Sequence, residues 1–150
     1  MKLVHITPAV LRSTDGIESI DKGVFGSWAS RFLIQYSKLN KEDDLDYECW
    51  STYDMKIFGD KGTTTGHELG IKYKLFPAFV LGPLFFSFPL IWELFNYKKE
   101  HKMIIHLQSM NNFLSYSIAF FLRNFPLVAQ ARSPNYPYYI KQIKTRKFIH

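Results

Sequence analysis

Short apolar stretches rich in β-branched and aromatic residues alternate along the chain with longer stretches whose apolar residues recur at helical spacing. The strand-like stretches are KLVHITPA (2–9), YECWSTY (47–53), GIKYKLFPA (70–78), MIIHL (103–107) and PLVAQA (126–131). Helical spacing is found over 28–39, 87–100 and 110–124. Alternation of this kind is typical of parallel sheets with right-handed connections. We therefore predict an α/β fold, a Rossmann-like open parallel sheet with helices on both faces.

Residues 75–92 form a run of eighteen residues without a charged side chain, the lower limit of length for a membrane-spanning helix. Three prolines and one glycine interrupt the run, so an undisturbed helix is the weaker interpretation. We predict instead the end of a strand, a loop and a new helix with Ser87 as its N-cap. This helix would turn Ile91, Leu94 and Phe95 toward the core.

The stretch 110–124 is apolar on nearly every side, which predicts a buried helix. Ser109 is in position to cap its first turn, and Asn124 followed by Pro126 would end it. The stretch 126–131 is predicted to form one more buried strand.

The composition of the 150 residues, 47% of them hydrophobic, predicts one globular domain and excludes wholesale disorder. The formal net charge of +6 favours anionic partners such as phosphates, nucleic acid or acidic lipid, without selecting one of them. Cys49 is the one cysteine, so the chain cannot form an internal disulfide. The first ten residues lack the longer apolar core of a signal peptide, and we expect a cytoplasmic protein.

Ligands of open parallel sheets bind beyond the carboxyl ends of the strands. Three polar segments are predicted to reach this edge: the loop 13–27, HLQS at 106–109 and QARS at 130–133. His106 would lie at this functional edge, although a histidine in such a position is as often a structural residue that is hydrogen-bonded to a neighbouring loop. The five histidines are scattered without the spacing of metal ligands, so we expect no metal site.

Two glycine-bearing segments have some features of phosphate-binding loops. In GDKGTTTG (59–66) the lysine precedes the second glycine and no helix follows, so this interpretation fails. GVFGSW (23–28) lies between a predicted strand and a predicted helix, but its G-x-x-G spacing is weak for a dinucleotide site. The helix N-terminus there either contacts a phosphate through free backbone N–H groups or is a simple helix start.

Four short segments stand in an order and spacing that resemble the N-terminal half of glycosyltransferase family 4. They are ECW (48–50), KLFPA (74–78), HLQS (106–109) and PLVAQ (126–130). No single segment is specific, and the resemblance, which runs over nearly the whole chain, rests on their order. Members of this family consist of two facing Rossmann-like domains, the GT-B architecture.

The resemblance implies a retaining transfer of a sugar from a nucleotide-sugar donor to a glycan or lipid-linked acceptor, without a metal or further cofactor. In this family the N-terminal domain mostly holds the acceptor, and the C-terminal domain binds the donor. The resemblance places the acceptor beside two polar turns, with the residues His106, Gln108, Ser109, Gln130 and Arg132. It places a loop near the donor phosphates, with the residues Gly16, Gly23, Gly26 and Ser27. It assigns no catalytic residue.

The sequence departs from the family pattern in two ways. Family members commonly have histidine and glycine after the VAQ strand, where this chain has Ala131, Arg132 and Ser133, so an acceptor-orienting histidine is missing there. The chain ends at His150, before a donor-binding domain and its acidic motif. We therefore expect a single N-terminal domain that is truncated relative to the family and inactive alone.

The alternative is a non-catalytic domain of the same fold that binds a membrane or another protein. Lysines flank the aromatic segment 76–95, which suits peripheral contact with the inner face of an anionic membrane, although core packing is the simpler interpretation. Nucleic acid is not an expected partner, because the apolar patterns already account for most aromatic residues. A pocket between the predicted acceptor residues and the glycine loop favours the transferase. One exposed patch of Phe79, Phe85 and Phe86 favours the membrane.

Overall fold

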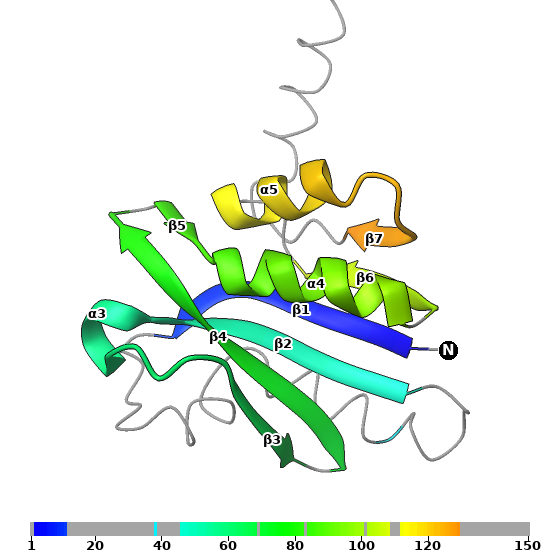
Figure 1. The fold of residues 1–150 in the computed structure, drawn as a ribbon, viewed down its shortest axis with the longest axis horizontal. Coiled ribbons are helices and arrows are strands. Elements are labelled where there is room, and N and C mark those ends of the chain that lie inside the picture. The colour runs from blue at the N-terminus through cyan, green and yellow to red at the C-terminus, as the bar shows by residue number, and fades with distance from the viewer. Residues whose placement is uncertain are drawn as a thin grey trace, which may run out of the picture.

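The computed structural model describes residues 2–11, 38, 46–68, 70–82, 84–100, 102–108 and 112–129. These residues form an α/β fold in which helices pack against one mixed, mostly parallel sheet (Figure 1). The strands are β1 (Lys2–Leu11), β2 (Asp46–Asp54), β3 (Thr64–Glu68), β4 (Ile71–Leu81), β5 (Leu84–Phe86), β6 (Met103–Leu107) and β7 (Leu127–Ala129). The helices are α3 (Met55–Phe58), α4 (Phe88–Glu100) and α5 (Phe113–Phe121).

Five strands of the described sheet run parallel, in the order β4-β2-β1-β6-β7. Counted along the chain, these strands have the order 3-2-1-4-5, so the growth of the sheet reverses between β1 and β6. We call this point of reversal the switch point. It matters for function because, in open α/β sheets, ligands bind at such a point, beyond the carboxyl ends of the strands.

The prediction of an all-parallel sheet is wrong for β3 and β5, the strands that precede and follow β4 in the chain. Strands β3 and β5 each pair with β4 in antiparallel orientation. Gly70 and Gly82 have positive φ values of 79° and 58° in the turns on either side of β4. Such short turns can only make hairpins, because a parallel crossover needs a dozen or more residues.

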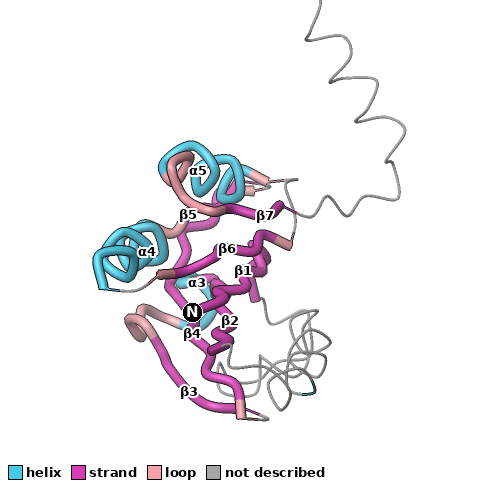
Figure 2. Tube along the Cα trace, turned by 90° about the vertical axis from the view of Figure 1, so that its right-hand side faces the viewer, coloured by secondary structure: helices cyan, strands magenta, loops and turns pink. Residues whose placement is uncertain are grey.

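The larger core lies between the sheet and the helices α4 and α5, which pack on the same face (Figure 2). Alternate residues of each strand point to this face and meet the inner sides of the two helices. The buried set is Val4, Ile6, Trp50, Phe76, Leu90, Ile91, Leu94, Tyr97, Met103, Ile105, Leu107, Leu114, Ile118 and Leu122.

A second, smaller core lies on the opposite face of the sheet, against α3. Met55 and Phe58 of this short helix pack on a cluster that consists of Tyr47, Cys49, Tyr53, Ile71 and Leu75. The helix predicted over 28–39 would add cover, but apart from Lys38 it lies outside the described residues. Helical cover of this second face is therefore described only at α3.

In the uncharged run 75–92 the end of β4 and the start of α4 lie as predicted, but the strand β5 occupies part of the predicted loop between them. Ser87 is buried, and its hydroxyl accepts a hydrogen bond from the Leu90 backbone N–H at 3.4 Å. The same hydroxyl donates to the Pro77 carbonyl at 2.8 Å, which ties the helix start to β4. Within the part of the chain that the structure describes, no helix has the length and apolar character needed to cross a bilayer.

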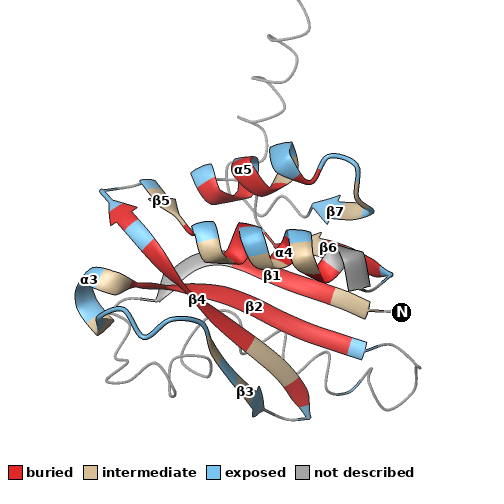
Figure 3. Ribbon diagram, in the orientation of Figure 1, coloured by how far each residue is buried: buried red, intermediate tan, exposed pale blue. Residues whose placement is uncertain are grey.

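Helix α5 differs from its prediction at its start and on its outer side. Asn112 caps the helix, because its side-chain oxygen accepts from the Ser115 backbone N–H at 2.9 Å, whereas the predicted cap Ser109 lies outside the described residues. The predicted complete burial is wrong, since the sheet covers one side of the helix and the aromatic residues of the other side are at least half exposed (Figure 3).

Two further predictions of burial are also wrong. Ile91 and Leu94 are buried as predicted, but Phe95 is partly exposed because it lies on the outer side of α4. Strand β7 is the last strand of the described sheet and pairs only with β6 there, so Val128 and Ala129 are exposed.

Candidate functional site at the switch point

Two histidines face each other across the switch point. Strands β1 and β6 are neighbours in the sheet, and their register places His5 opposite His106. The two Nδ1 atoms are 3.0 Å apart, and the ring centroids are 4.8 Å apart at an angle of 60°. Because a hydrogen bond between them needs one donor and one acceptor, one Nδ1 carries a proton and the other does not. His5 is buried, whereas His106 is half-buried and reaches the surface.

A second polar pair follows one step further toward the carboxyl ends of the same strands. The Thr7 hydroxyl donates to the side-chain oxygen of Gln108 at 2.8 Å, and both residues are buried. The Gln108 backbone N–H donates to the Ile6 carbonyl at 3.0 Å and so extends the ladder between β1 and β6. The Ser51 hydroxyl, from β2, donates to the Thr7 carbonyl at 3.3 Å.

We call His5, Thr7, His106 and Gln108 the switch-point group. Residues two apart on a strand share a face, so the two cross-strand pairs lie side by side on the face of the sheet opposite to α4. The group combines imidazole, hydroxyl and amide functions and contains no carboxylate. Such neutral donors and acceptors suit a ligand with several hydroxyl groups, because each hydroxyl both donates and accepts a hydrogen bond.

The structure brings two of the predicted site residues together and leaves the others undescribed. His106 and Gln108 lie on one face of β6 and its carboxyl end, at the predicted edge of the sheet. The other predicted site residues lie outside the described residues: Gly16, Gly23, Gly26, Ser27, Ser109, Gln130 and Arg132. The predicted pocket, with His106, Gln108 and Arg132 facing the glycine loop, therefore remains a prediction.

Sequence reasoning missed His5 and Thr7 as members of the site. A signal for them exists in the first strand, where the two polar residues alternate with Val4 and Ile6 and must share one face. Their pairing with His106 and Gln108 needed the strand order, which periodicity along the chain does not contain.

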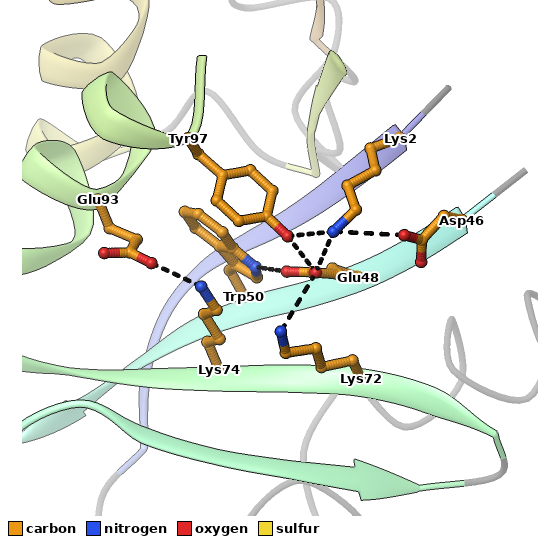
Figure 4. A network of polar contacts seen from close by, with 8 residues as sticks. All are labelled: Lys2, Asp46, Glu48, Trp50, Lys72, Lys74, Glu93 and Tyr97. Atoms are coloured by element: carbon orange, nitrogen blue, oxygen red, sulfur yellow. Dashed lines mark hydrogen bonds and ion pairs between the residues drawn. The ribbon is translucent and has the colours of Figure 1, made fainter. Parts of the chain in front are cut away.

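A second polar network surrounds Glu48 at the opposite, amino end of the strands (Figure 4). The carboxylate of Glu48 is buried and accepts hydrogen bonds from Lys2 Nζ at 2.9 Å, Trp50 Nε1 at 2.9 Å and the Tyr97 hydroxyl. Lys72 Nζ lies 3.7 Å from the same carboxylate. Strands β1, β2 and β4 and the end of α4 therefore meet at one buried negative charge.

The donors of this network change the pKa values of its members. Burial alone would raise the pKa of Glu48, but the hydrogen bonds from Tyr97, Lys2 and Trp50 outweigh it and lower the pKa to about 2. Burial and the hydrogen bond to Glu48 raise the pKa of Tyr97 to about 12. Burial lowers the pKa of Lys2, but hydrogen bonds with Tyr97 and Glu48 reverse that effect and raise it above its usual range.

Lys74 extends the network along β4 and is buried. Its Nζ donates to Glu93 Oε1 at 2.6 Å. The same ammonium lies 4.9 Å from the ring centroid of Trp50 and 4.7 Å from that of Tyr97. A carboxylate and two aromatic faces thus compensate the burial of this charge.

The position of the Glu48 network assigns it a structural role. It lies at the amino end of the strands, whereas ligands of open α/β sheets bind at the carboxyl ends. Its charges are matched within the network, which fixes the start of β1 to β2 and to α4. The switch-point group is therefore the better candidate for function.

Three further observations on the described residues do not add a second candidate site at the sheet. Burial and the charge of Glu48 raise the pKa of the Cys49 thiol to about 12, so this cysteine is a poor nucleophile in the folded protein. Among the described residues there is no group of three or more histidine, cysteine and acidic side chains that could hold a metal ion. One shallow depression lies on α5, lined by Phe113, Tyr116, Ser117, Phe120 and Phe121.

Comparison of the chain with protein-family models, with curated proteins and with solved structures found no match.

Proposed function

We propose that this chain is the acceptor-side domain of a retaining glycosyltransferase, which moves a sugar from a nucleotide-sugar donor to a glycan or lipid-linked acceptor. The observation that carries the proposal is the switch-point group, in which His106 and Gln108, at the carboxyl end of β6, pair with His5 and Thr7 of the neighbouring strand β1. Ligands of open α/β sheets bind at this position. The reaction class rests on the family resemblance, because this type of fold serves many chemistries.

In this proposal His106 and Gln108 hydrogen-bond hydroxyl groups of the acceptor sugar. His5 and Thr7 act behind them, since His5 orients the His106 ring and Thr7 orients the Gln108 amide. Fixed donors and acceptors of this kind hold the attacking hydroxyl in one orientation, which is a large part of the catalysis of group transfer. Gln130 and Arg132 and the glycine-bearing loop belong to the same proposed cleft.

We propose further that the sheet is the Rossmann-like half of a GT-B fold. The 3-2-1-4-5 order of the parallel strands supports this assignment. A donor-binding domain would then face the carboxyl edge of the sheet and hold the nucleotide sugar opposite the acceptor. No metal is part of the proposed mechanism, and the chain alone would bind an acceptor without turning over a donor.

Saturation-transfer NMR with a panel of mono- and disaccharides tests acceptor binding by the chain alone. We expect weak, saturable binding of at least one sugar, and we expect His106→Ala and Gln108→Ala each to weaken it at least about tenfold, because each removes a hydrogen bond to the ligand from a partly desolvated site. His67→Ala is the matched control, because His67 is an exposed histidine on the edge strand β3. This control should bind like the wild type.

Two results would contradict the proposed function. One is the absence of saturable binding to every sugar in the panel. The other is binding that both switch-point substitutions leave unchanged, which would place the sugar site elsewhere on the protein.

The membrane-binding alternative was expected to show one exposed patch of three phenylalanines, and the structure supports this only in part. Phe79 is exposed, but Phe85 and Phe86 are half-buried and pack against the larger core. The patch predicted from these three residues is therefore incomplete. A different and larger group of aromatic side chains is exposed on α4 and α5.

A further inference from the structure

Helix α5 has two apolar sides, and one of them faces solvent. Leu114, Ile118 and Leu122 are buried against the sheet and α4. The other side carries only aromatic residues at helical spacing, with exposed fractions of 50% to 67%: Phe113, Tyr116, Phe120 and Phe121. Side chains of this size strongly favour leaving water, so a helix that is apolar all round is normally covered on every side.

Helix α4 presents a second aromatic row on the same face of the sheet. Phe88 and Trp92 are exposed by 63% and 59%, and their rings stack at a centroid distance of 6.0 Å. Phe95 is partly exposed and continues this row. Figures 2 and 3 show α4 and α5 side by side in one layer, with exposed residues on both. We call the outward side chains of the two helices the aromatic face; it consists of Phe88, Trp92, Phe95, Phe113, Tyr116, Phe120 and Phe121.

The β4–β5 hairpin extends the aromatic face beyond the helices. Leu81 and Leu84 form the last residue pair before its tip, and both are more than half exposed. Phe86 of the hairpin contacts Phe113 of α5, at a centroid distance of 6.0 Å. A contiguous group of exposed large apolar side chains of this kind marks a docking surface.

The charge of the chain indicates what this surface meets. Residues 69–150, which include the whole aromatic face, contain eleven lysines and arginines and only two acidic residues. Glu93 is one of the two and is paired with Lys74 at 2.6 Å. Arg123 and Lys102 lie near the ends of α5 and α4 and are exposed. An apolar surface with exposed basic side chains at the ends of its helices is complementary to a surface that is apolar inside and negative outside.

We propose that the aromatic face docks on a bilayer that contains anionic lipids. Tryptophan, tyrosine and phenylalanine would enter the region between headgroups and acyl chains, while the basic side chains attract the headgroups. The contact is peripheral, because none of the helices in the described part of the chain could cross the bilayer. This inference goes beyond the proposed sugar transfer and does not depend on it.

Sedimentation with vesicles tests the docking surface on the full chain. We expect binding to vesicles of phosphatidylcholine with about 30% phosphatidylserine that is at least about tenfold tighter than binding to pure phosphatidylcholine, and that weakens as salt rises. Phe120→Glu combined with Phe121→Glu should reduce binding to the anionic vesicles at least about tenfold. Ile57→Glu is the control, since Ile57 is an exposed apolar residue on α3, against the opposite face of the sheet.

Two further measurements test the proposal even if the double variant does not fold. The single change Phe120→Ser should weaken binding in the same direction, with an unchanged circular dichroism spectrum. Trp92 fluorescence should shift to the blue on addition of anionic vesicles, and Trp92→Phe should remove most of this shift while it preserves sedimentation. Trp92 is exposed and Trp50 is fully buried, whereas Trp28 lies outside the described residues, so the loss of the shift in Trp92→Phe is what assigns it to Trp92.

Several outcomes would overturn the proposal. Equal binding to neutral and anionic vesicles would contradict the proposed role of the basic side chains. Binding that the substitutions on α5 leave unchanged would show that the aromatic face is not the surface that contacts the bilayer. If the chain ignores vesicles but forms a dimer that Phe120→Glu with Phe121→Glu dissociates, the aromatic face is covered by a second copy instead.

Discussion

Glu48 is a buried carboxylate that three donors of different chemistry hold in place. The ammonium of Lys2, the indole of Trp50 and the hydroxyl of Tyr97 all reach it, from two strands and a helix. Removing such a charge from water is costly, and only this complete set of donors makes the ionised form favourable. The contribution of Glu48 to stability therefore depends on pH.

We predict that acid destabilises the protein through Glu48. The pKa of Glu48 is about 2 in the folded protein against 4.5 for an unperturbed glutamate, so the unfolded chain binds the proton first as pH falls. The stabilisation is fully present above pH 4.5 and is lost as pH falls from 4.5 to about 2. Glu48→Gln should lower the free energy of unfolding by about 3 kcal/mol at pH 7 and flatten this part of the pH profile. Urea titrations followed by circular dichroism at several pH values measure both effects.

Asp46→Asn is the matched control for this prediction. Asp46 pairs with the same Lys2 ammonium at 3.3 Å, but its side chain is 59% exposed. Its replacement should change the free energy of unfolding by less than about 1 kcal/mol. Two results would contradict the role of the buried Glu48 carboxylate. One is an equal loss of unfolding free energy from both substitutions. The other is a free energy of unfolding for Glu48→Gln that falls with pH below 4.5 in parallel with that of the wild type.

At the scale of elements, local signals predicted where several elements begin, and tertiary packing decided which sides they expose. Ser87 caps α4 as predicted, because a capping serine acts on backbone groups only a few residues away. The burial of Phe95 and of the whole of α5 was predicted wrongly. Their exposure depends on where the sheet ends, which no local pattern encodes.

We predict that Ser87→Ala destabilises α4 and its connection to β4. The substitution removes the cap on Leu90 and the hydrogen bond to Pro77, and should lower the free energy of unfolding by about 1 to 2 kcal/mol. Ser117→Ala is the control, because the Ser117 hydroxyl donates to the Phe113 carbonyl inside α5, where alanine has the better helix propensity. The comparison is made by thermal unfolding of both variants. A larger loss of stability for Ser117→Ala than for Ser87→Ala would contradict the assignment of Ser87 as the cap of α4.

At the scale of the whole molecule, one sheet carries different groups of residues at its two ends and on its two faces. The Glu48 network fixes the amino end, the switch-point group occupies the carboxyl end, and the aromatic face covers the outside of α4 and α5. The smaller core around Cys49 lies on the other face of the sheet. If the fold is one cooperative unit, this core opens only when the whole sheet unfolds.

We predict that Cys49 reports global unfolding. Its burial and raised pKa, about 12, should make reaction with a thiol reagent slow in the native protein and complete in urea. Since Cys49 is the one cysteine, every reaction is assigned to it. Labelling against urea concentration should give the same midpoint as circular dichroism; fast labelling in native buffer would show that the smaller core opens separately.

The sequence by itself determined the types and approximate bounds of β1, β2, β4, β6, β7, α4 and α5, since the spacing of apolar residues and the capping and turn residues act over a few positions. It also placed His106 and Gln108 at the carboxyl end of a strand. Only the tertiary structure decided that β1 lies beside β6, which pairs His5 with His106, and that β3 and β5 run antiparallel to β4. It also decided that one side of α5 faces solvent. Pairing and exposure depend on contacts between residues far apart in the chain, and periodicity within one element carries no information about its neighbours.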